Sequence, residues 1–225
     1  MKQPRLSRLM TWERHVNLVL TVLLRALAIL QTRARPSDSE ITLNRELYFC
    51  LLEANNQLLK ASGEAINHAP VPEGKNPPDP DDVKRAKREN KIPDFYWGFI
   101  DHTADPRRSA RYFFIECKRL GKPLRLDWIF NENYIHDGVQ RFITEEHAYA
   151  KGEKAAAMVG YVQSMDLPDI LSEVNTAAGA VSVALLSGPV GGWKKGGISK
   201  LEHDLTRPFH ISPLYLQHFW LDCRP

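Results

Sequence analysis

The most constraining feature of the sequence is an apolar segment that ends in two opposite charges. The range Arg111 to Cys117 is rich in aromatic and β-branched residues and predicts a β-strand. Side chains alternate between the two faces of a strand, so Glu116 and Lys118 share one face with Phe114. A strand this apolar is expected near the centre of a sheet, where burying two charges is costly unless they pair or bind a metal.

A second strand is predicted just before this one. Phe95 to Ile100 has strand composition, and Asp101 to Ser109 has turn composition, so the two strands are expected to form a hairpin. Pairing in a hairpin would bring Asp94 next to Glu116. Two neighbouring carboxylates repel each other, and a divalent cation relieves that repulsion. Oxygen ligands of this kind suit Mg²⁺ or Mn²⁺.

These residues resemble the PD-(D/E)xK nuclease superfamily, which includes many restriction endonucleases and DNA-repair nucleases. Pro93-Asp94 matches the PD element, and Glu116-Cys117-Lys118 matches (D/E)xK at the end of a hydrophobic strand. The resemblance covers Ser39 to Val162 through the order helix, strands, helix, strand. It implies an α/β fold with a restriction endonuclease-like core, in which helices flank a central mixed β-sheet.

The resemblance also implies a chemistry. Asp94 and Glu116 would hold Mg²⁺, with Mn²⁺ able to substitute, and the cation would polarise a scissile phosphate of DNA. Lys118 would orient or help to deprotonate the attacking water and would stabilise charge on the phosphate. The expected activity is that of a Mg²⁺-dependent deoxyribonuclease, taken as an endonuclease. By analogy with small standalone members of the superfamily, its role is expected in bacterial defence against phage.

The superfamily commonly adds an acid from the helix before the first strand. Ser37-Asp38-Ser39 offers N-cap oxygens for a helix that runs to about Ala61. Its core-facing stripe comprises Leu43, Leu47, Cys50, Leu51, Ala54 and Leu58. Glu40 falls near the centre of this stripe and Glu46 about a quarter turn away, so Glu40 is preferred as a fourth catalytic residue. The alternative role for Glu40 is to stabilise the first turn of the helix.

The N-terminal part of the chain predicts one more helix, from Thr11 to Gln31. Arg25 interrupts its apolar run, so neither a signal peptide nor a membrane span is expected. Residues 1–35 are interpreted as an N-terminal helical extension and residues 36–225 as the nuclease-like domain. The chain has 225 residues, of which 43% are hydrophobic, enough for one sizeable core. The three cysteines lack metal or disulfide spacing and predict buried thiols and a cytoplasmic location.

Several cations are candidates for contact with a nucleic-acid backbone. A proline-rich loop, His68 to Asp82, is followed by a basic run, from which Lys84, Arg85, Lys87 and Arg88 are the candidates. Gln140 and Arg141 join them from a helix predicted over Tyr134 to Ala150. Lys194 and Lys195 lie in a glycine-rich loop, Ser187 to Ser199, with Trp193 as a stacking aromatic. For each group the alternative is an ordinary solvated surface.

The remaining elements are predicted from local pattern. They are short strands at Leu124 to Ile129 and Ala155 to Val162, a helix over Pro168 to Asn175, and a terminal strand over Tyr215 to Leu221. Two other interpretations of the chain stay open. It could be a catalytically silent nuclease-like module that binds nucleic acid or a partner protein. For either function, association with a partner protein or as a homo-oligomer is left open. Glu116 and Lys118 could also form a structural ion pair.

Overall fold

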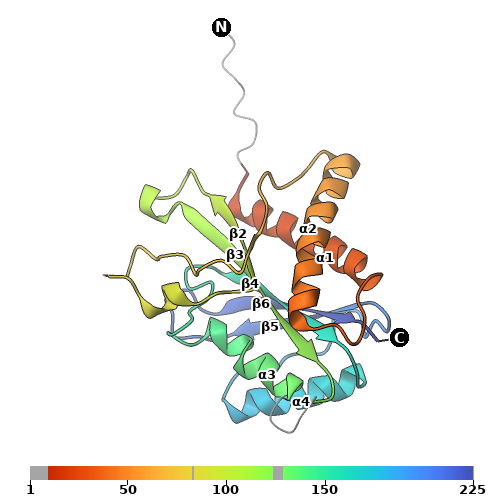
Figure 1. The fold of residues 1–225 in the computed structure, drawn as a ribbon. Helices are drawn as coiled ribbons and strands as arrows, with labels where there is room; N and C mark the ends of the chain where they lie inside the picture. The colour runs from red at the N-terminus through yellow and green to blue at the C-terminus, as the bar shows by residue number, and fades with distance from the viewer. Residues whose placement is uncertain (1–9, 83, 124–128, 225) are drawn as a thin grey trace.

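The computed structural model describes residues 10–82, 84–123 and 129–224 (Figure 1). Its helices are α1 (Trp12–Gln31), α2 (Glu40–Ser62), α3 (Phe130–His136) and α4 (Leu167–Ala180). Its strands are β1 (Val71–Pro72), β2 (Phe95–Ile100), β3 (Ala110–Leu120), β4 (Ala155–Val162), β5 (Ile198–Leu205) and β6 (Leu214–Asp222). Short 3-10 turns cover Lys87–Asn90, Pro106–Arg108 and Val139–Phe142.

The strands form one six-stranded mixed sheet in the order β1-β2-β3-β4-β6-β5. Neighbours are antiparallel at β1/β2, β2/β3 and β5/β6, and parallel at β3/β4 and β4/β6. Figure 1 shows α1 and α2 on one side of this sheet and α3 and α4 on the other. The predicted α/β class, with a mixed sheet flanked by helices, is therefore confirmed. β3 lies at the centre beside β4, and the central position predicted for β3 from its apolar sequence is confirmed.

Two hydrophobic cores occupy the two faces of the sheet, and strand alternation divides the residues of β3 between them. Phe113, Ile115 and Cys117 pack against α1 and α2 in the first core. Phe114 and Leu120 point into the second core, which includes residues of α3 and α4. The expected alternation along β3 is thus confirmed, and Glu116 and Lys118 belong to the row of Phe114.

Both N-terminal helices begin where their capping residues predict. The side chain of Thr11 accepts the backbone N–H of Arg14, and α1 starts at Trp12. The side chain of Ser39 accepts the backbone N–H of Thr42, and α2 starts at Glu40. α1 buries its apolar face in the same core as α2 and the sheet. Among the described residues, no helix is both long and apolar enough to cross a membrane.

The helix predicted over Tyr134 to Ala150 was wrong. α3 begins earlier, at Phe130, and ends at His136. Gly138 has left the helical conformation, with φ −119° and ψ −84°. A Cβ at this position would lie only 2.4 Å from the carbonyl oxygen of Tyr134, so this turn after α3 has room for glycine alone. Farther on, Ala148 and Ala150 have φ angles of 47° and 54°, which are incompatible with a right-handed helix.

The C-terminal half differs from expectation in two further respects. β5 was not predicted, although its residues alternate between buried and exposed as a strand with one solvated face should. α4 continues to Ala180, beyond the predicted end at Asn175. Most of the strand expected over Leu124 to Ile129 lies outside the described residues. The predicted strands over Ala155 to Val162 and Tyr215 to Leu221 are confirmed as β4 and β6.

Candidate active site

The candidate site forms where β3 runs past the start of β2. The last paired residues on that side are Phe95 and Ile115, whereas Glu116 to Leu120 still pair with β4 on the other side. Two backbone N–H groups of β3 therefore face an edge with no strand. Carboxylates take their place: Asp94 Oδ2 accepts the N–H of Cys117 at 2.7 Å, and Glu40 Oε2 accepts the N–H of Arg119 at 3.3 Å. The open edge of β3 thus fixes two acids beside the strand.

The ammonium group of Lys118 lies at the centre of the carboxylates. Its Nζ is 3.1 Å from Glu40 Oε1, 3.1 Å from Glu116 Oε1 and 3.8 Å from Asp94 Oδ2. It also donates to the carbonyl oxygen of Cys117 at 2.8 Å. The hairpin brings Asp94 beside Glu116, as its register predicts, with 3.4 Å between the backbone nitrogen of Asp94 and Glu116 Oε2. The four residues proposed as catalytic from the sequence therefore lie in one cluster.

Glu116 is the most buried member, with none of its surface exposed. Arg141 donates to its Oε1 at 2.6 Å, so two cations neutralise this one carboxylate. Burial, followed by the charge of Asp94, raises the pKa of Glu116 to about 8. Burial alone would lower the pKa of Lys118, but the surrounding carboxylates outweigh it and raise that pKa. Lys118 is therefore a charged hydrogen-bond donor at neutral pH.

The two acids considered on α2 have different surroundings. Glu40 is the first residue of the helix, and Figure 1 shows this first turn beside the carboxyl end of β3. Glu46 lies more than a turn farther along and pairs with Arg45 at the surface. The structure thus brings Glu40 to the cluster and leaves Glu46 outside it.

Two residues at the site were not identified from the sequence. The amide of Asn44 donates to Asp94 Oδ1 at 3.0 Å, and the hydroxyl of Tyr161 donates to Asn44 Oδ1 at 2.9 Å. Asn44 is four residues after Glu40, so both lie on the stripe of α2 that faces the sheet. A polar side chain on an otherwise apolar stripe is the signal that points to Asn44. Tyr161 gives no such signal, since a tyrosine in a core strand is common.

A pocket of about 280 Å³ opens beside the cluster. Its lining consists of Glu40, Lys118, Arg119, Phe130, Asn133, Asp137 and Arg141. The guanidinium of Arg119 stacks over the ring of Phe130, 4.4 Å from its centroid. Three of the lining side chains are cations, which suits an anionic group approaching the carboxylates.

Of the cations predicted to contact nucleic acid, Arg141 lies in the site and Arg88 does not face solvent. Arg88 is 5% exposed, donates to Asp82 Oδ2 at 2.9 Å and donates to the carbonyl oxygen of Pro77 at 3.0 Å. In this structure Arg88 holds the proline-rich loop together, and its contact with phosphate stays a prediction. Gln140 is half-buried in the short turn that also carries Arg141.

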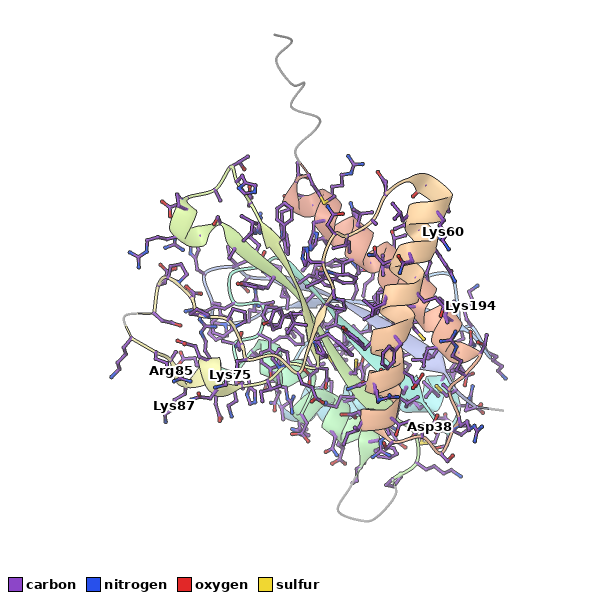
Figure 2. The ribbon with its side chains drawn as sticks, turned by 45° about the horizontal axis from the view of Figure 1, so that its top comes forward. Asp38, Lys60, Lys75, Arg85, Lys87 and Lys194 are labelled. Atoms are coloured by element: carbon purple, nitrogen blue, oxygen red, sulfur yellow. The ribbon has the colours of Figure 1, made fainter. Side chains whose placement is uncertain are left out.

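The exposed cations form two separate groups. Lys84, Arg85 and Lys87 are exposed, and Arg85 lines a shallow hollow together with Lys75. Figure 2 shows Lys75, Arg85 and Lys87 on one side of the molecule and Lys194 on the opposite side. Lys194 and Lys195 are exposed. The ring of Trp193 stacks on the buried Trp220 at 5.8 Å between centroids, so an internal partner already covers one face of this aromatic.

The donor chemistry of the cluster fits a hard divalent cation. Within residues 10–82, 84–123 and 129–224, no three histidine, cysteine, aspartate or glutamate side chains already form a metal-binding group. The carboxylates converge instead on Lys118. When Glu116 is ionised, three carboxylates face the cations of Lys118 and Arg141, which leaves net negative charge. Asp94 and Glu116 are the residues that could hold the ion, with Glu40 beside them.

No known protein family, curated protein or solved structure matches this chain.

Proposed function

We propose that this chain is a metal-dependent nuclease with a restriction endonuclease-like core that hydrolyses phosphodiester bonds of DNA. One observation carries the proposal: Glu40, Asp94 and Glu116 converge on Lys118 at the open edge of the central strand β3. A cluster of buried charges of this kind is costly for the stability of the fold. Residues with strongly perturbed pKa values, such as Glu116, gather at functional sites. The order α2, β2, β3, α3, β4 supports the proposed core.

The roles of the residues follow from their contacts. Asp94 and Glu116 would hold Mg²⁺, which would neutralise charge that develops on the phosphate. Lys118, which keeps its proton at neutral pH, would orient the attacking water and donate to a phosphate oxygen rather than act as the base. Glu40 orients Lys118 by accepting a hydrogen bond from its Nζ at 3.1 Å. Arg141, which is partly exposed, would turn toward the substrate backbone.

The test is cleavage of plasmid and linear DNA with Mg²⁺ or Mn²⁺, and with EDTA as the blank. Asp94→Ala and Lys118→Ala are expected to abolish cutting. Glu40→Gln and Glu46→Gln form a matched pair on one helix, of which only the first should lose activity. Undiminished cutting by Asp94→Ala or Lys118→Ala would refute the assignment.

A second candidate is a catalytically silent module that binds nucleic acid or a partner protein. It is favoured by the pairing of Glu116 with both Lys118 and Arg141, which neutralises this acid without a metal. DNA binding without cleavage under either metal would support this candidate. Plasmid nicking or linearisation that depends on Asp94 would exclude it.

A further inference from the structure

The carboxylate of Asp94 is held by one donor on each oxygen. Oδ2 accepts the backbone N–H of Cys117 at 2.7 Å, and Oδ1 accepts the side-chain amide of Asn44 at 3.0 Å. The first donor is part of β3 and the second part of α2. A carboxylate oxygen has two lone pairs, so each oxygen keeps one for a further ligand. These two donors fix the orientation of Asp94 while leaving it able to coordinate an ion.

Asn44 is itself fixed by a third residue. The hydroxyl of Tyr161 on β4 donates to Asn44 Oδ1 at 2.9 Å. Asn44 is 9% exposed and Tyr161 fully buried, so neither has water as an easy alternative partner. An ionised carboxylate only accepts hydrogen bonds, so the amide NH₂ of Asn44 must face Asp94 and its oxygen must face Tyr161. The chain Tyr161, Asn44, Asp94 therefore has one consistent direction of donation.

The position of Asn44 joins this chain to the rest of the cluster. It lies one helical turn after Glu40, so α2 carries both an acid of the site and the donor that orients another acid. The relation is that of an outer-shell residue to a metal ligand, where a hydrogen bond orients the ligand and tunes its affinity for the metal.

We propose that Asn44 is a positioning residue, held in place by Tyr161, that aligns the Asp94 carboxylate for binding a divalent cation. The inference rests on the proposed function, because it assigns Asp94 to a metal.

The experiment measures the affinity of the full chain for Mn²⁺ by titration calorimetry without DNA. The variants are Asn44→Ala, Tyr161→Phe, the double variant and Asp94→Ala. Asn44→Ala is expected to weaken Mn²⁺ binding by about 10- to 100-fold, the usual cost of removing an outer-shell partner. Tyr161→Phe should weaken it less. The double variant should match Asn44→Ala, because Tyr161 acts only through Asn44.

Asn55→Ala is the matched control for a general loss of structure. Asn55 is on the same helix and makes two hydrogen bonds with the backbone of Ile66, at 2.8 and 2.9 Å. Its removal should lower the melting temperature and leave Mn²⁺ affinity unchanged. If Asn55→Ala weakens Mn²⁺ binding as much as Asn44→Ala does, the effect is structural and the inference is overturned.

The outcomes separate the inference from the proposed function. If wild type binds Mn²⁺, Asp94→Ala does not, and both Asn44→Ala and Tyr161→Phe bind as wild type does, the positioning role is wrong and the metal site stands. If Asn44→Ala does not fold, Tyr161→Phe alone decides, because it removes one hydroxyl and keeps the ring. If wild type binds no Mn²⁺, the metal site and the positioning role both fail.

Discussion

Replacing Glu116 with glutamine should change how the stability of this protein depends on pH. Burial and the charge of Asp94 raise the pKa of Glu116 to about 8, against an ordinary value of 4.5. Between these two values the folded state holds a proton on Glu116 that the unfolded state has released. The folded state is therefore favoured at low pH, and this contribution is lost as pH rises toward 8.

The useful window lies between pH 6.5 and 8. Burial lowers the pKa of several histidines, which acts in the opposite sense, but wild type and Glu116→Gln carry the same histidines, so that contribution cancels when the two are compared. From pH 6.5 to 8 a fully buried carboxyl with a pKa near 8 should lose about 1–2 kcal/mol of stability. Glu116→Gln cannot titrate and should lack this loss.

The assay is urea unfolding of the metal-free chain at pH 6.5, 7.25 and 8. Wild type should lose about 1–2 kcal/mol of stability across the series relative to Glu116→Gln. Glu46→Gln, which removes a partly exposed acid that pairs with Arg45 at the surface, should follow wild type. Parallel curves for wild type and Glu116→Gln would refute the reasoning, because Glu116 would then be ionised throughout the window.

Two further predictions concern the proline-rich loop and the sheet. Arg88→Ala should destabilise the fold by about 1–3 kcal/mol in urea unfolding, because Asp82 keeps Lys151 but loses Arg88, and the carbonyl oxygen of Pro77 loses its donor. Lys87→Ala should leave stability unchanged and weaken DNA binding in a salt-dependent way. Equal stability of the two variants would contradict this prediction. Gly160→Ala should lower stability by about 1–3 kcal/mol, since its Cβ would lie 2.5 Å from Leu120 Cδ1 and 2.8 Å from Trp220 Cδ1. Gly152→Ala meets nothing within 4 Å and lacks this steric cost. A Gly160→Ala variant as stable as wild type would show that the side chains of Leu120 and Trp220 can shift to make room.

Local chemistry was enough to predict the elements that begin with a clear cap or a strongly apolar run. Ser39 marks the start of α2 because its side chain can satisfy a free N–H of the first turn. β4 matched its predicted limits, Ala155 and Val162, because a short apolar run bounded by polar residues is typical of a fully buried strand. The alternation that places Glu116 and Lys118 on one face is a property of any strand.

Elements whose limits depend on distant contacts were predicted poorly. After α3 the chain passes so close to β4 that a Cβ at Gly138 would lie 2.7 Å from Met158 Cε, so only glycine fits there. β5 is held by its pairing with β6, and its alternating sequence resembles an exposed loop until β6 is placed beside it. In both cases the contacting residues belong to another strand, so the local sequence pattern does not reveal where the element begins or ends.

The candidate site shows the same division. The sequence by itself determined that Asp94, Glu116 and Lys118 carry opposite charges at adjoining strand ends, and that Glu40 lies on the buried stripe of its helix. Only the tertiary structure decided that β3 outruns β2, so that two free backbone N–H groups draw Asp94 and Glu40 to the edge of the strand. The reason is physical: a backbone donor left without a strand partner must find another acceptor, and which one it finds depends on the packing of α2.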